Sequence, residues 1–249
     1  MQKKLVEVCF TPDIYGYFEN KFEIVVVIDV LRATSAICSA IHNGVNSIIP
    51  VSTVEEAMTY KEKGFVVGAE RQGEIVEGFD IGNSPFSYMD PKLKGKDIVL
   101  TTTNGTRAIN IAREAPTVVI GSLINLNYLV EWLLQENKNV LCLCSGWKGN
   151  FNLEDTICGG AIADELLKTG RYTSDEDSSV AAKYLYQSAK GNYFGFLKSS
   201  SHRRRLKRLN LNEDVKFCLT PNQMNVIPVL KDGKIVKMEV EQLTGSTKV

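Results

Sequence analysis

The chain has 249 residues, of which 44% are hydrophobic and 23% charged, and its 29 basic residues balance its 29 acidic residues. This composition is that of a globular protein and excludes an intrinsically disordered chain, which has low hydrophobicity or a large net charge. Zero net charge argues against a dedicated nucleic-acid-binding protein, which is usually strongly basic. The longest apolar runs, of five residues, are too short to span a membrane. We therefore expect that the protein binds neither nucleic acid nor a membrane.

Length and cysteine content favour a reduced, compact protein. The six cysteines include no C-x-x-C pair and are expected to be buried thiols. The N-terminal segment has no apolar stretch long enough for a signal peptide, so we expect a cytoplasmic protein. A single domain over residues 1–249 is expected, as a homo-oligomer and most simply a two-fold dimer.

Strands and helices alternate along the first two thirds of the chain. The β-branched run 24–28 is typical of a strand covered on both faces, and apolar spacing over 33–41 then predicts a helix that ends at Asn43-Gly44. Ser52 and Glu55 form a capping-box pattern for a second helix. Further strands are predicted at 47–51, 65–67, 98–100, 118–120 and 140–144, and further helices around 108–112, 126–134 and 153–168. This order implies an α/β fold with a mostly parallel sheet and helices on both faces.

The last third of the chain has a different pattern. A helix is predicted over 175–190, with Ser174 and Asp177 in position to cap it, and helical structure continues to about Leu209. Strands are predicted at 215–219 and 226–230, and Asp232-Gly233 is a hairpin signal that leads into a strand at 235–240. We expect these strands to form an antiparallel extension of the main sheet.

Polar and charged residues follow four of the predicted strands. Ligands of open parallel sheets bind at the carboxyl ends of the strands, so these segments are expected to share one rim. They supply acids, arginines, hydroxyls and glycines. The segments are 29–34, 68–73, 101–107 and 145–155.

These residue types suit an anionic ligand bound with a divalent cation. Thr101 to Thr106 is a hydroxyl-rich turn at a helix N-terminus, where free N–H groups and the helix dipole favour phosphate, and Gly105 lets the backbone come close. Arginine forms forked bonds to phosphate or sulfonate, and Mg²⁺ prefers carboxylate oxygens, usually one or two of them. With only two histidines, His42 and His202, a histidine-rich zinc or di-iron centre is not expected. The candidate arginines are Arg32, Arg71 and Arg107, and the candidate metal ligands are Asp29, Glu70, Glu154 and Asp155.

Each feature also has a purely structural explanation. Asp29 and the turn 101–104 could each do no more than cap a helix, and the 154–155 pair favours a first helical turn without any metal. Arg32 and Arg107 could be solvated helix residues. The basic run 203–208 fits one helix face, as solvated surface or a subunit contact rather than a nucleic-acid site. A ligand site is favoured because four independent strand ends would otherwise all have to be structural.

At these residues the sequence resembles the 2-phosphosulfolactate phosphatase family of coenzyme M biosynthesis. The block Gly78-Phe79-Asp80-Ile81-Gly82-Asn83-Ser84-Pro85 is its most specific part, because no generic nucleotide or phosphate motif has that form. The resemblance covers nearly the whole chain. The other matching stretches are 26–34, 68–71, 102–106, 144–146, the pair Glu154-Asp155, and 214–215 with 226–228.

The resemblance implies a three-layer α/β/α fold and Mg²⁺-dependent hydrolysis of (R)-2-phospho-3-sulfolactate to 3-sulfolactate and phosphate. In the resulting hypothesis Mg²⁺ is held by Asp29, Glu70 and an acid of the 154–155 pair, and Arg71 contacts the sulfonate or carboxylate of this small polyanion. Arg32, Arg107 and the amides of 103–106 would neutralise the phosphate. The catalytic candidates are Asp29, Arg32, Asn104 and Arg107, and the substrate-binding candidates are Thr34, Arg71, Thr103, Gly105, Thr106 and Ser145.

Three alternatives stay open at this stage. Asp29 could itself attack phosphorus, in place of a metal-bound water. A haloacid-dehalogenase-like phosphatase of another small phosphomonoester also places an aspartate after an apolar strand, but in a D-x-D pattern whose second position is Leu31 here. A non-catalytic sensor of a phosphorylated metabolite would use the same arginines and helix N-terminus without needing the acids.

Overall fold

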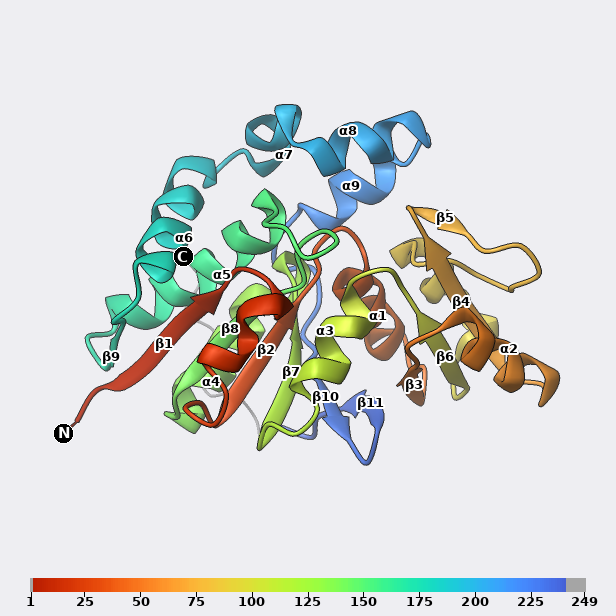
Figure 1. Ribbon diagram of the computed structural model, residues 1–249, viewed down its shortest axis with the longest axis horizontal. Coiled ribbons are helices and arrows are strands. Elements are labelled where there is room, and N and C mark those ends of the chain that lie inside the picture. The colour runs from red at the N-terminus through yellow and green to blue at the C-terminus, as the bar shows by residue number, and fades with distance from the viewer. Residues whose placement is uncertain (1, 241–249) are drawn as a thin grey trace.

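The computed structural model describes residues 2–240, and its strands form one large sheet (Figure 1). The order across the sheet is β5-β4-β6-β3-β11-β10-β7-β2-β8-β1-β9. The strands are β1 (Lys4–Cys9), β2 (Ile24–Ile28), β3 (Ser47–Pro50), β4 (Val66–Arg71), β5 (Glu74–Ile75), β6 (Asp97–Thr101), β7 (Thr117–Gly121), β8 (Val140–Cys144), β9 (Tyr172–Thr173), β10 (Pro228–Lys231) and β11 (Lys234–Lys237).

The sheet consists of two parallel halves joined by an antiparallel hairpin. On one side β7, β2, β8, β1 and β9 pair in parallel, and on the other side β3, β6 and β4 do. The hairpin β10–β11 is antiparallel to its neighbours β7 and β3. It turns at Asp232-Gly233, where both residues have positive φ, as a tight hairpin turn requires. The predicted α/β fold is confirmed, and the C-terminal hairpin fills the middle of the sheet.

Helices cover both faces of this sheet. The α-helices are α1 (Ala33–His42), α2 (Val54–Glu62), α3 (Gly105–Ala112), α4 (Leu126–Glu136), α5 (Leu153–Lys168), α6 (Asp177–Ala189), α7 (Tyr193–Phe196), α8 (Ser201–Arg208) and α9 (Asn212–Cys218). Short 3₁₀ helices are η1 (Pro12–Tyr17), η2 (Pro85–Met89), η3 (Pro91–Leu93), η4 (Leu123–Asn125) and η5 (Leu197–Ser199). Within residues 2–240, every helix is too short or too polar to cross a membrane.

The core lies in two layers, one on each face of the sheet. Along β2, Ile24, Val26 and Ile28 pack with α4, α5 and α6, whereas Val25 and Val27 pack with α1 and α3. This alternation follows from the two-residue period of a strand. It explains why β2 is apolar at every position, as predicted. The six cysteines are buried and unpaired, also as predicted.

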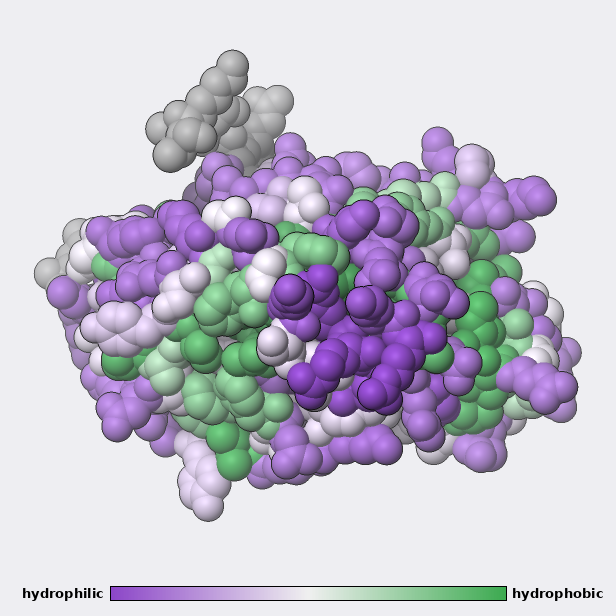
Figure 2. Space-filling view, turned by 90° about the horizontal axis from the view of Figure 1, so that it is seen from above, coloured by the Kyte–Doolittle hydropathy of each residue, from purple (hydrophilic) through white to green (hydrophobic). Residues whose placement is uncertain are grey.

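From α6, which covers one face of the sheet, the chain continues into α7 to α9, which form an arch over the end of the sheet toward which the parallel strands point (Figure 1). Figure 2 looks onto this arch from above and shows strongly hydrophilic residues gathered over α8, which contains the whole basic run 203–208. The arch therefore brings residues from the last quarter of the chain over the carboxyl ends of β2 and β8.

Three sequence predictions differ from the structure. The predicted strand 215–219 is wrong, because this segment lies in α9, where Asp214, Val215 and Cys218 are buried with helical spacing and acids occupy the first turn. The helix α2 begins one residue later than predicted, since Thr53 accepts from the Glu56 N–H. Ser174 does not cap α6; its hydroxyl donates to Glu7 of β1, a strand that the sequence patterns did not indicate.

The contact between α5 and α6 depends on a glycine, which gives a first prediction. A Cβ at Gly160 would lie 2.0 Å from the carbonyl oxygen of Ala182 in α6, so Gly160→Ala forces the two helices apart. We expect a loss of at least about 1–3 kcal/mol in unfolding free energy, measured by urea denaturation. Gly16→Ala is the matched control, because nothing lies within 4 Å of its added Cβ. An unchanged midpoint for Gly160→Ala would contradict this close packing.

Candidate active site

Asp29 lies at the carboxyl end of β2, in the loop that leads into α1. Asp29 is 7% exposed, and its Oδ1 accepts only one long hydrogen bond, of 3.4 Å, from the Ala33 N–H. Burial raises the pKa of Asp29 to about 6; His202 opposes this shift, and Glu70 and Glu154 add to it. The loop is held by Thr34, whose buried hydroxyl accepts from the Asp29 N–H at 3.0 Å. Thr34, predicted to bind substrate, thus lies beneath the site and positions Asp29.

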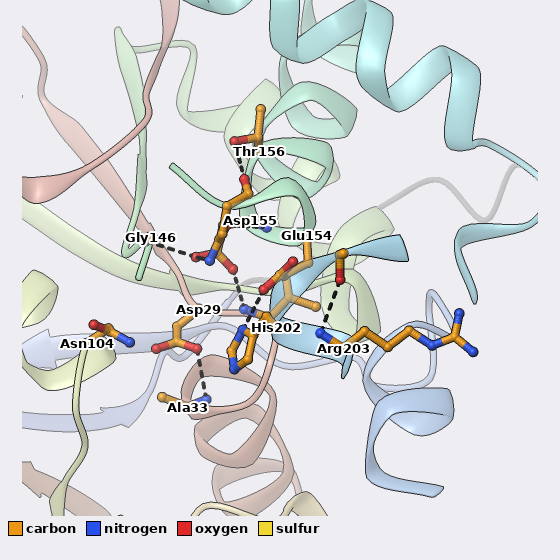
Figure 3. Close-up of polar contacts among 12 residues, drawn as sticks. Asp29, Ala33, Asn104, Gly146, Glu154, Asp155, Thr156, His202 and Arg203 are labelled. Carbon is orange, nitrogen blue, oxygen red and sulfur yellow. Dashed lines mark hydrogen bonds and ion pairs between the residues drawn. The ribbon is translucent and has the colours of Figure 1, made fainter. Parts of the chain in front are cut away.

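Glu154 pairs with a histidine in the arch. It lies in the first turn of α5, is 1% exposed, and its Oε1 is 2.6 Å from His202 Nδ1. The other oxygen, Oε2, is buried and has no hydrogen-bond partner among the described residues. Figure 3 shows His202 lying beside both Asp29 and Glu154. His202 was missed as a site residue because its sequence context, the start of a basic helix, carries no catalytic signal.

Asp155 has a different role from its neighbour. Its Oδ1 accepts from the Val30 N–H at 2.8 Å, and its Oδ2 accepts from the Gly146 N–H at 3.1 Å and from Asn152 Nδ2 at 2.8 Å. Burial raises the pKa of Asp155 well above its ordinary value, with Asp29 and Glu154 adding to the shift. Both oxygens are therefore used to hold together the loops that follow β2 and β8.

Glu70 at the end of β4 is likewise bound to backbone groups. Its carboxylate accepts from the Gly73 N–H at 2.5 Å and from the Thr103 N–H at 3.1 Å. The Thr103 hydroxyl lies 3.3 Å from both carboxylate oxygens. Glu70 thus ties the β4–β5 turn to the turn that precedes α3.

The N-terminus of α3 points at Asp29. A Cβ at Gly105 would lie 2.9 Å from Asp29 Oδ2, so glycine allows this helix end to approach the carboxylate. Thr102 and Thr106 exchange backbone-to-hydroxyl bonds of 3.1 and 3.2 Å. Asn104 does not cap the helix with its side chain; its Oδ1 accepts from the Lys148 N–H at 3.0 Å. The turn is therefore held by its own hydrogen bonds and lies against the Asp29 carboxylate. Of the 103–106 amides expected to meet a phosphate, the Thr103 N–H already donates to Glu70 and the Thr106 N–H to Thr102 Oγ1.

The three predicted arginines all have protein partners. Arg32, 4% exposed, donates to Asp214 of α9 and to the Gly73 carbonyl, each at 2.6 Å. Arg71 donates to the Glu70 carbonyl at 2.6 Å and to Thr101 Oγ1 at 2.9 Å. Arg107 is half exposed and pairs with Asp13. Ser145, at the end of β8, instead has a buried hydroxyl without a partner among the described residues.

The acids of the rim thus differ in what their oxygens can still bind. Among residues 2–240, no group of three or more His, Cys, Asp or Glu side chains is arranged to hold a metal ion. Asp155 and Glu70 are committed to N–H donors, whereas Asp29 and Glu154 each keep an oxygen without a bond from the described residues. The fold and this rim define an α/β protein with a cluster of buried acids at the carboxyl ends of its parallel strands, which is where open parallel sheets bind their ligands.

Comparison with known proteins gives the family. The family model described as 2-phosphosulpholactate phosphatase matches residues 10–233. A protein of Caldanaerobacter subterraneus subsp. tengcongensis named "Probable 2-phosphosulfolactate phosphatase" is 41% identical over 84% of this chain and 88% of its own length. Proteins of the same name from Clostridium perfringens (37% identical, 94% of this chain, 96% of theirs) and Thermotoga maritima (39%, 86% and 92%) are also similar. The chain belongs to the 2-phosphosulfolactate phosphatase family and thus to the phosphoric monoester hydrolases.

Proposed function

We propose that this chain hydrolyses (R)-2-phospho-3-sulfolactate to 3-sulfolactate and phosphate, and that it requires Mg²⁺. The observation that carries the proposal is the pair of buried carboxylates, Asp29 and Glu154, each with an oxygen to spare, beside the N-terminus of α3. The family name supports the substrate, and the geometry supports binding of a phosphate next to a cation.

The donor set fits Mg²⁺ through two carboxylates. Mg²⁺ usually takes one or two protein carboxylates and completes its shell with water and substrate phosphate. Asp29 and Glu154 match this number, and the buried Glu154 Oε2 lacks any other partner among the described residues. When bound, Mg²⁺ would offset phosphate charge and increase the acidity of a bound water. Glu70 and Asp155 would contribute by fixing the loops around the ion.

The chain's own groups would orient the phosphate. The first turn of α3 lies against Asp29 and would attract the phosphate through the positive end of its dipole, although its Thr106 N–H already donates to Thr102 Oγ1. Thr103 lies at the same turn and is fixed by Glu70. His202 Nδ1 bonds to Glu154 and so holds that carboxylate in one orientation. Positioning and charge neutralisation of this kind provide most of the catalysis in phosphoryl transfer.

The identity of the nucleophile is a separate choice within the proposal. We favour attack by water, with Asp29 retained as a carboxylate that binds Mg²⁺. In the alternative, Asp29 attacks phosphorus and forms a phosphoaspartate. Rapid quench with radiolabelled substrate followed by peptide mapping distinguishes the two, and label on Asp29 would exclude direct attack by water.

Two broader proposals accompany this activity. We propose that the protein acts in the cytoplasm in coenzyme M synthesis. We also propose that it is a homodimer, because two-fold dimers are the commonest oligomers.

Phosphate release tests the proposed function directly. With 2-phospho-3-sulfolactate and Mg²⁺ we expect turnover, and with a chelator we expect its loss and its recovery when Mg²⁺ is restored. Glu154→Gln should lower kcat/KM by roughly 100-fold, because one candidate ligand loses its charge. Glu165→Gln, on the same helix and paired with Lys168 at the surface, is the matched control and should be unaffected.

Two results would contradict this function. Tight binding of the substrate without turnover of any phosphomonoester would favour the non-catalytic sensor. Turnover of other small phosphomonoesters, with none of phosphosulfolactate, would favour a different phosphatase specificity.

A further inference from the structure

Arg205 of α8 has a partly buried guanidinium without a counter-ion. Its Nε and Nη2 atoms are buried and have no hydrogen-bond acceptor among the described residues. Its guanidinium carbon lies 4.0 Å from the centre of the Trp147 ring, within the range of a cation–π contact. Burial lowers the pKa of Arg205, and Glu154 opposes that shift. Buried N–H groups normally have an acceptor, so an acceptor is to be expected from outside residues 2–240, and a bound anion can supply it.

The other arginines around the rim do not share this property. The guanidinium of Arg32 is neutralised by Asp214, and that of Arg71 bonds to Glu70 O and Thr101. Arg203, two residues before Arg205, lies 3.5 Å from the Phe194 ring centre and donates to the Phe194 carbonyl. Within residues 2–240, Arg205 is thus the arginine whose buried nitrogens are without an acceptor.

Arg205 lies at the site already described. His202, three residues earlier on the same face of α8, contacts Glu154 (Figure 3). Its ring centre is 5.2 Å from that of Trp147. Trp147 belongs to the loop after β8, which begins with Ser145 and its unpartnered buried hydroxyl. Ser145 and Glu154 lie on segments beneath the arch and Arg205 lies on the arch itself, and each has a buried polar atom without a partner among the described residues. A cation at Glu154 and an acid group of the same ligand at Arg205 would satisfy the two charged groups.

We infer that Arg205, packed against Trp147, binds the acid end of the substrate, its carboxylate or sulfonate, and makes the enzyme prefer substrates that carry it. This inference rests on the proposed function, which assigns the phosphate to Asp29, Glu154 and the first turn of α3. A guanidinium fork matches the paired oxygens of a carboxylate or sulfonate. The basic run predicted to be solvated surface or a subunit contact would then close over the substrate.

Three phosphate esters test the role of Arg205 and separate its two possible partners. They are 2-phospho-3-sulfolactate, 2-phospholactate, which lacks the sulfonate, and 2-(phosphooxy)propane-1-sulfonate, which lacks the carboxylate. We expect Arg205→Met to raise KM for the full substrate roughly 10- to 100-fold, with a smaller effect on kcat. The analogue that lacks the group bound by Arg205 should show no such change, which identifies that group. Arg205→Lys, which keeps the charge without the fork, should restore only part of the affinity.

Arg204→Met is the matched control. Arg204 is an exposed neighbour whose guanidinium bonds to the Ser199 carbonyl, and its replacement should leave all three substrates unaffected. An equal loss for all three esters in Arg205→Met would overturn the inference, because it would indicate a structural role or a contact with the phosphate. Calorimetric binding of 3-sulfolactate, weakened in Arg205→Met and unchanged in Arg204→Met, tests the contact without turnover. Binding unchanged in Arg205→Met would also overturn it, whether or not the wild-type protein proves to be a phosphatase.

Discussion

Replacing Asp29 by asparagine should lower phosphate release by roughly 10³- to 10⁴-fold and yet stabilise the metal-free protein at neutral pH. The first effect follows from the loss of the carboxylate that faces the N-terminus of α3. The second follows from burial, because an ionised Asp29 beside Glu70 and Glu154 opposes folding. If Asp29 binds Mg²⁺ as proposed, its carboxylate is a case in which activity is gained at the expense of stability.

The stability gained in Asp29→Asn should depend on pH, in a direction that follows from the pKa of Asp29. The pKa of Asp29 is about 6 in the folded protein and 3.8 ordinarily, so the folded state binds more protons between these values. The contribution of Asp29 to stability is therefore most favourable below about pH 4 and falls as pH rises through this window. Above about pH 6 the ionised group costs the folded state up to about 3 kcal/mol.

Urea unfolding in the presence of a chelator, at pH 4 and pH 7, measures this difference. Asp29→Asn should gain stability at pH 7 and little at pH 4, whereas Asp177→Asn, an exposed acid in the first turn of α6, should gain none at either pH. Loss of stability at both pH values would show that the Asp29 carboxylate mainly supports the loop before α1. It would thereby favour the purely structural explanation of this residue.

The alternation of strands and helices was predictable because its signals are local. The strand 24–28 and the helix 153–168 were each predicted from the residue pattern within one segment, and the structure contains both. The segment 215–219 was predicted to be a strand, but it is short and mostly apolar, a pattern that does not by itself distinguish a strand from a buried helix. Its helical burial is set by contacts with distant elements, among them the bond from Arg32 to Asp214. The position of the hairpin in the middle of the sheet also depends on distant pairing.

The site was predictable only where it follows strands. The rule that ligands bind at the carboxyl ends of parallel strands selected Asp29, Glu70 and the turn before α3, which the structure places around one rim. His202 and Arg205 were not predicted, because they come from a helix that folds back over that rim. Neither the basic run 203–208 nor the zero net charge of the chain indicated which arginine would be buried. The arch that buries Arg205 is a tertiary feature.

Removal of Asp214 should have the largest effect on stability. Asp214→Ala leaves the Arg32 guanidinium, in a residue 4% exposed, without its carboxylate partner at 2.6 Å. Breaking one partner of a buried pair typically costs about 3–5 kcal/mol, because the remaining charge stays desolvated. We expect a loss of this size in urea unfolding. Glu213→Gln, one residue earlier and exposed, should lose less than about 1 kcal/mol and serves as the control.

The double variant Arg32→Met/Asp214→Leu decides what Arg32 does. Replacing a buried ion pair by apolar side chains is often close to neutral, so the double variant should recover most of the stability lost in Asp214→Ala. If Arg32 contacts the substrate, the refolded double variant should remain inactive in phosphate release. Near-normal turnover would instead show that Arg32 only joins the loop after β2 to α9 and to the Gly73 carbonyl, and that the charge of the substrate is neutralised by other groups. Arg205 and the first turn of α3 would then be the remaining candidates for that neutralisation.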